Sequence, residues 1–130
     1  MLKYEKILKI KSDLDDVKNN LEDIVEQLNK LLKNEDLMFD LRLILNELVV
    51  NGVIHGNKLD ENKKVELRVL IEDNNIQIKV MDEGHGFEYD RDSYDPLDMK
   101  SSGRGLFIVD GLSDELSISD EGVSVVKYLS

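Results

Sequence analysis

Residues 36–56 place the strongest constraint on how this chain can fold. Apolar side chains cover most of the circumference that this segment would have as a helix, so we expect a helix buried nearly all round and ended by Gly56. Three polar residues, Glu47, Asn51 and His55, interrupt the apolar surface at i, i+4 and i+8 and form one stripe. Buried polar groups cost free energy unless they are paired, so this stripe needs a partner.

Hydrophobic periodicity predicts the other elements. We expect a strand at 2–10, an amphipathic helix at 14–32 capped by Ser12, a hairpin of strands 64–72 and 75–82, a short helix on the apolar run 106–109, and a closing hairpin of 115–120 and 122–129. The order contains no regular strand–helix–strand repeat. We therefore predict an α+β fold: a single two-layer α/β sandwich with one mixed or antiparallel sheet and helices on one face.

Length and composition narrow the class of protein. The chain has 130 residues and a net charge of −11, so we expect one domain (1–130) and no direct binding of nucleic acid or of an anionic membrane. Cysteine is absent, and the longest uncharged apolar run, 48–54, is far shorter than a membrane span. A cytoplasmic location is the expectation.

The stripe on the buried helix suggests a metal–nucleotide site. Glu47 and Asn51 lie one helical turn apart, and Mg²⁺ in proteins takes a few hard oxygen ligands and completes its shell with phosphate and water. A carboxylate there could instead accept a proton from an attacking hydroxyl. The alternative is that both side chains bond to neighbouring backbone inside the core.

Two glycine-containing segments could complete such a site. Asp82-x-Gly84-x-Gly86 ends a predicted strand, where a carboxylate can accept from an exocyclic amino group and glycines let a ring approach the backbone. Gly103-Arg104-Gly105-Leu106 opens a predicted helix, whose N-terminus attracts phosphate, with Lys100 adding charge nearby. Each segment alone could equally be an ordinary turn or linker. Residues 87–104 between them show no periodicity, and such long loops are usually functional, often as lids.

Taken together, the three motifs resemble those of the GHKL (Bergerat-fold) ATPase superfamily. Residues 46–56 look like its N box, 82–86 like its first glycine box and 103–106 like its second. Within that superfamily, Asn-Glu-x-x-x-Asn-x-x-x-His-Gly in a small single domain looks most like the anti-sigma factor serine-protein kinases of bacteria. The resemblance covers essentially the whole chain and implies the histidine kinase-like ATPase fold.

The resemblance also implies roles for single residues. Glu47 would be the general base, Asn51 the Mg²⁺ ligand and Asp82 the partner of the adenine amino group. The nucleotide, ATP or ADP, would further be bound by residues of both glycine boxes and the lid: Gly84, Gly86, Lys100, Gly103, Arg104, Gly105 and Leu106. Residues 87–104 would form the ATP lid.

The resemblance further implies partner switching. An ATP-dependent serine/threonine protein kinase would hold a sigma factor and phosphorylate a serine of the anti-sigma antagonist that releases it, so regulating transcription. A homodimer is a further expectation, because the apolar stripe of 14–32 could serve as an interface as well as core.

Two other functions stay open. The first is an ATP/ADP-gated protein-binding regulator with little or no kinase activity, because Ser101 stands where the classical kinases often carry arginine. The second is a detached catalytic domain that phosphorylates a histidine of another chain.

Overall fold

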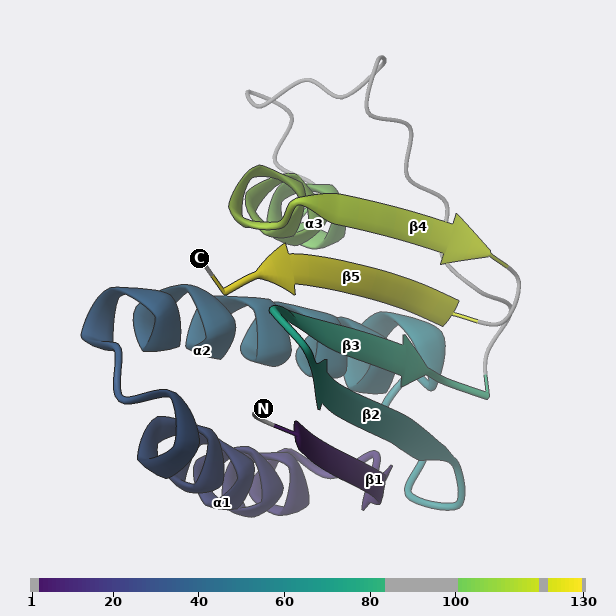
Figure 1. The fold of residues 1–130 in the computed structure, drawn as a ribbon. Helices are drawn as coiled ribbons and strands as arrows, with labels where there is room; N and C mark the ends of the chain where they lie inside the picture. The colour runs from purple at the N-terminus through teal and green to yellow at the C-terminus, as the bar shows by residue number, and fades with distance from the viewer. Residues whose placement is uncertain (1–2, 84–100, 120–121, 130) are drawn as a thin grey trace.

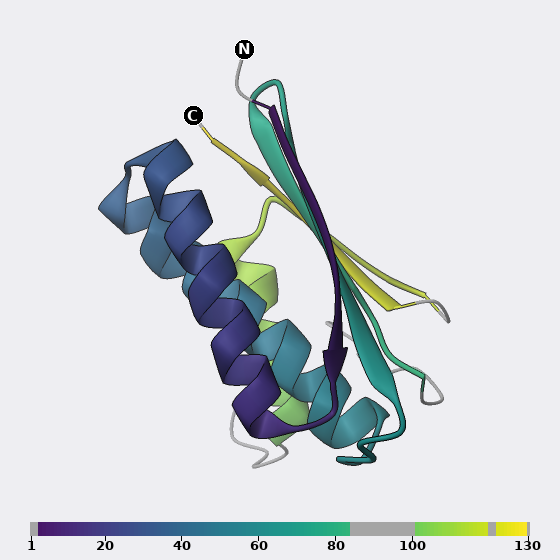
Figure 2. The same ribbon diagram turned by 90° about the horizontal axis from the view of Figure 1, so that it is seen from below.

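The structure, a computed structural model, describes residues 3–83, 101–119 and 122–129, the side chains of residues 101–104 excepted. Five strands and three α-helices form two layers, a sheet and a layer of helices (Figures 1 and 2). The elements are β1 (Lys3–Lys11), α1 (Leu14–Leu32), α2 (Glu35–Asn51), the π-helix η1 (Gly52–Gly56), β2 (Lys64–Glu72), β3 (Asn75–Met81), α3 (Ser101–Leu112), β4 (Glu115–Ser119) and β5 (Gly122–Tyr128). This is the predicted α+β sandwich.

The sheet has the strand order β1-β2-β3-β5-β4, and every pairing in it is antiparallel. The strand pairs β2–β3 and β4–β5 are the two hairpins that the alternating sequences predicted. In the turn between β2 and β3, Asp73 adopts a positive φ of 55°. After β3 the chain continues through α3 to β4, which is the edge strand. The next strand, β5, then lies between β3 and β4. This path brings α3 over the sheet beside α2 (Figure 1).

All three helices cover one face of the sheet, with α2 between α1 and α3 (Figures 1 and 2). The expectation that α2 is buried nearly all round holds only in part, because Phe39, Arg42 and Asn46 are exposed. Seven of its apolar side chains are buried: Leu37, Met38, Leu41, Ile44, Leu45, Leu48 and Val49. The apolar stripe of α1 belongs to the same core through Val17, Leu21, Ile24 and Leu28, while Leu14 and Leu31 at its ends are exposed.

The helices differ from the prediction in three details, although the helical segment of α2 and η1 does end at Gly56 as expected. Asp13, not Ser12, caps α1, because its side chain accepts from the Asp15 N–H at 3.0 Å while Ser12 is buried elsewhere. The helix that we expected to follow the second glycine box begins earlier, at Ser101, so Gly103 and Gly105 lie inside it. The long central helix changes to π geometry at Gly52, because Asn57 N–H bonds to the carbonyl five residues earlier.

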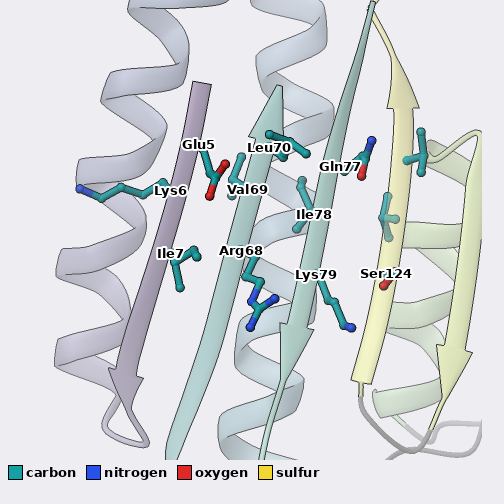
Figure 3. A pocket seen from close by; sticks show the side chains of 12 residues that line it. Glu5, Lys6, Ile7, Arg68, Val69, Leu70, Gln77, Ile78, Lys79 and Ser124 are labelled. Atoms are coloured by element: carbon teal, nitrogen blue, oxygen red, sulfur yellow. The ribbon is translucent and has the colours of Figure 1, made fainter. Parts of the chain in front are cut away.

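None of the helices in the described residues lies over the opposite face of the sheet (Figure 2). It carries a shallow hollow of about 290 Å³ across β1, β2, β3 and β5 (Figure 3). Both charged and apolar side chains border this hollow, among them Arg68, Lys79, Ile7 and Leu70. No helix within the described ranges is long and apolar enough to cross a membrane.

Two glycines should respond oppositely to the same substitution. Gly122 has a φ of +147°, and an added Cβ would overlap the Val80 carbonyl oxygen, so Gly122→Ala should lower the free energy of unfolding by roughly 1–3 kcal/mol. Gly111 lies in α3 with no described atom within 4 Å of an added Cβ, so Gly111→Ala should raise it by about 0.5–1 kcal/mol. Urea unfolding followed by circular dichroism measures both. Equal effects would contradict the described β3–β5 contact.

Candidate functional site

The helices α3 and α2 pack closely at three predicted site residues. A Cβ added to Gly105 would overlap the Glu47 carboxylate and lie 3.3 Å from Asn51 Nδ2. A side chain at position 105 would therefore displace the Glu47 carboxylate from the place that it occupies. The i, i+4 spacing on α2 places both of them on the face that α3 meets, as the sequence predicted.

The side-chain amide of Asn51 points to a missing ligand at this place. Its Nδ2 is buried and has no hydrogen-bond partner among the described residues. Buried polar atoms of native proteins are nearly always bonded, so an unpartnered one needs an explanation. The amide can turn by half a rotation and present its oxygen instead, so it suits either a phosphate oxygen or a hydrated Mg²⁺. The residues present thus fit the group that the sequence motifs imply.

A second close contact places Asp82 against the last residue of η1, which continues α2. A Cβ added to Gly56 would overlap the Asp82 carboxyl group and lie 2.7 Å from its Oδ1. Asp82 directly follows β3 and is half-buried. The last residue of η1 therefore packs against the carboxylate that the sequence assigns to adenine recognition. Gly56 lies five residues after Asn51 and nine after Glu47, so the two contacts are spread along the helix, which suits an elongated ligand.

His55 does not continue the polar stripe of Glu47 and Asn51. It lies in η1 and is exposed. A π-helical turn holds more residues than an α-helical one, so the i, i+4 repeat ends at Asn51.

Sequence reasoning missed Asn57, the residue after η1. Its side chain is 1% exposed and bonds to three segments that are distant in the sequence. The sequence around Asn57 did not reveal this role, because an asparagine after a glycine at the end of a helix is also common where a helix simply ends.

Several predicted site residues lie outside the part of the chain that the structure describes. These are Gly84, Gly86, Lys100 and the lid residues 87–100. Gly103 and Arg104 lie in the first turns of α3. The side chain of Leu106 is 1% exposed and belongs to the hydrophobic core, so it supports α3 from within.

Two hollows elsewhere contain none of the predicted catalytic or nucleotide-binding residues. One is the hollow on the open face of the sheet (Figure 3), and the other is a groove of about 720 Å³ between α1 and α2 that exposes Phe39. Within the described ranges, no cluster of three or more His, Cys, Asp or Glu side chains could hold a metal. A metal at Asn51 would therefore depend on ligand oxygens as well as on the protein.

Comparison with known proteins identifies the family of the chain. The chain is 31% identical over 103 residues to the "Serine-protein kinase RsbW" of Listeria monocytogenes, which covers 70% of this chain and 66% of that protein. It is 31% identical over 91 residues to the "Anti-sigma F factor" of Geobacillus stearothermophilus, covering 66% and 62% respectively. The match to the "Serine-protein kinase RsbW" of Bacillus subtilis is 29% over 107 residues, covering 73% and 67%.

These alignments span about two thirds or less of the length of the first two relatives. A family model described as "Histidine kinase-like ATPase domain" matches residues 10–127, from the end of β1 to β5, and so includes every motif named above. The chain belongs to the histidine kinase-like ATPase domain family.

Proposed function

We propose that this chain is an ATP-dependent serine/threonine protein kinase that acts as an anti-sigma factor. The proposal rests on the contact between Glu47, Asn51 and Gly105. There a carboxylate and a buried amide without a described partner face α3, close to its start at Ser101. The relatives named as serine-protein kinases and an anti-sigma factor support the same assignment.

Glu47 would act as the general base. Its carboxylate is half-buried against Gly105 and can accept the proton of a serine hydroxyl as that oxygen attacks the terminal phosphate. The close packing of α3 at Gly105 would limit the positions open to the carboxylate, and fixed geometry is a large part of what an enzyme contributes to phosphoryl transfer.

Asn51 would hold the metal and the phosphates. Its amide oxygen is one hard ligand of the kind that Mg²⁺ accepts, and the phosphates and water would supply the others. When bound, Mg²⁺ would neutralise charge on the transferred phosphoryl group. The first turn of α3, with Gly103 and Arg104, presents free N–H groups to the same phosphates.

Asp82 would accept a hydrogen bond from the amino group of adenine, because an ionised carboxylate is an acceptor only. Its contact with Gly56 holds it at the end of β3, next to the helix that carries Glu47 and Asn51. We also propose that the nucleotide is bound by Gly84 and Gly86, which would let the base approach the backbone, and by Lys100 of the lid.

The proposed partners are a sigma factor, which the chain would hold, and an anti-sigma antagonist, whose serine it would phosphorylate. Such a switch would work in the cytoplasm, and we propose a homodimer as its active form. The second candidate is an ATP/ADP-gated binding regulator without kinase activity, which the serine at position 101 favours. The phosphate found on the antagonist separates these functions. A serine kinase leaves acid-stable phosphoserine, and a binding regulator leaves no phosphate. A catalytic domain that phosphorylates histidine would leave acid-labile phosphohistidine.

The first test is nucleotide binding. Calorimetric titration should show that the chain binds ATP and ADP and that binding weakens without Mg²⁺. The substitution Asp82→Asn should lower the affinity for ATP about ten- to a hundredfold, because the adenine amino group loses its hydrogen bond to a charged acceptor. Asp73→Asn, the same change at the exposed opposite end of β3, is the matched control. Equal affinities for the wild type and Asp82→Asn would refute the adenine role.

The second test separates binding from chemistry. Glu47→Ala and Glu47→Gln should bind ATP as the wild type does but transfer phosphate about 10²- to 10⁴-fold more slowly, because the proton has no acceptor. Transfer of labelled phosphate from ATP to a co-purified antagonist measures this, with Glu61→Ala, an exposed carboxylate, as the control. Unchanged transfer in the Glu47 variants contradicts the general-base role. No acid-stable phosphate with the wild type favours the binding regulator.

The third test probes the close packing of α3. Gly105→Ala should push Glu47 and Asn51 out of place and lower the affinity for Mg²⁺–ATP about ten- to a hundredfold. Gly111→Ala makes the same change in the same helix where no described atom is within 4 Å, so it should leave affinity unaltered. Similar affinities of the two variants would show that α3 does not constrain the site.

A further inference from the structure

Asn57 is one of two buried polar residues in the described part of the chain, and Ser12 is the other. The π-helix delivers Asn57 to this place, because its N–H bonds to the Gly52 carbonyl at 2.8 Å and the chain turns inward there. A buried amide is costly unless each of its hydrogen-bonding groups finds a partner. Asn57 meets this requirement with both ends of its side chain.

The nitrogen end of the Asn57 amide faces the start of β2. Nδ2 donates to Ser12 Oγ at 2.9 Å and to the Lys64 carbonyl at 3.1 Å. Ser12 Oγ in turn donates to the Lys63 carbonyl at 2.8 Å. These bonds join the β1–α1 connection to the start of β2, so they anchor the amide within the rigid part of the fold.

The oxygen end faces the segment that follows β3. Asn57 Oδ1 accepts from the Glu83 backbone N–H at 2.8 Å. The Glu83 carboxylate accepts from the Lys64 backbone N–H, so this residue is held from both its backbone and its side chain. Asp82 is the next residue back, and its carboxyl packs on Gly56. The consecutive residues Gly56 and Asn57 thus contact the consecutive residues Asp82 and Glu83.

We propose that Asn57 is a positioning residue that fixes the Asp82 carboxylate for a six-amino purine and so sets the chain's selectivity for that base. The proposal rests on the proposed function, because it takes Asp82 as the group that accepts from adenine. Without the bond from Glu83, the end of β3 can shift, and a hydrogen bond to the base weakens steeply with misalignment. The phosphates, bound near Asn51, would not feel this change.

Selectivity is therefore the quantity to measure. The probes are ATP and purine riboside triphosphate, which lacks the six-amino group but carries the same phosphates. Asn57→Ala should lower ATP affinity about tenfold and the affinity for the analogue less than about twofold, so the preference for ATP falls. Asn57→Asp keeps an oxygen that can accept from Glu83 and should retain most of the preference.

Ser12→Ala is the matched control for a merely structural role. It removes a partner of the same buried amide on the side away from Asp82 and should reduce stability in urea while keeping the wild-type preference for ATP. A wild-type preference in Asn57→Ala, or an equal loss in Ser12→Ala, overturns the proposal. Should Asn57→Ala not fold, Asn57→Ser carries the same test, because it too removes the carbonyl that accepts from Glu83.

Amide hydrogen exchange at Glu83 distinguishes failure of this inference from failure of the proposed function. Asn57→Ala without nucleotide should speed exchange of the Glu83 N–H more than Ser12→Ala does, and equal exchange in the two variants overturns the positioning role. If the wild type binds ATP and purine riboside triphosphate equally, Asp82 does not recognise the six-amino group. The proposed function then fails at this residue, independently of the hydrogen exchange measured at Glu83.

Discussion

The burial of α2 is the constraint on which the rest of the structure depends. The helix lies between α1 and α3 and against the sheet, and all seven of its buried side chains are apolar. Two of its half-buried polar side chains, Glu47 and Asn51, face α3, where Gly105 leaves room for them. The site is therefore a consequence of how three helices share one face of the sheet.

The departure from α-helical geometry at Gly52 is equally important to the site. A straight continuation would carry the chain on past the end of β3. The π turn instead places Gly56 on the Asp82 carboxyl and Asn57 in the buried network behind it. Insertions of this kind often occur at functional sites, because they redirect backbone without ending the helix. Here the redirected residues join the end of α2 to the end of β3.

Local patterns predicted the strands, the two long helices and the convergence of Glu47 and Asn51, because each depends on the spacing of neighbouring residues. They did not predict the α1 cap, since Ser12 and Asp13 can both cap a helix and only the bond between Ser12 and Asn57 decides the matter. They also missed Asn57, whose partners lie 45 and 26 residues away at Ser12 and Glu83. Interactions at that distance leave no periodicity in a single sequence.

The glycine at position 105 shows that the site, and not the fold alone, determines this part of α3. Glycine inside a helix costs about 1 kcal/mol relative to alanine. A chain that needed only the sandwich could place an apolar residue at 47 and alanine at 105, and would gain both packing and helix stability. The chain has a carboxylate facing a glycine instead, beside an amide without a described partner. Three costs meet at one point, and the proposed binding of a nucleotide by the carboxylate and the amide would account for all of them together.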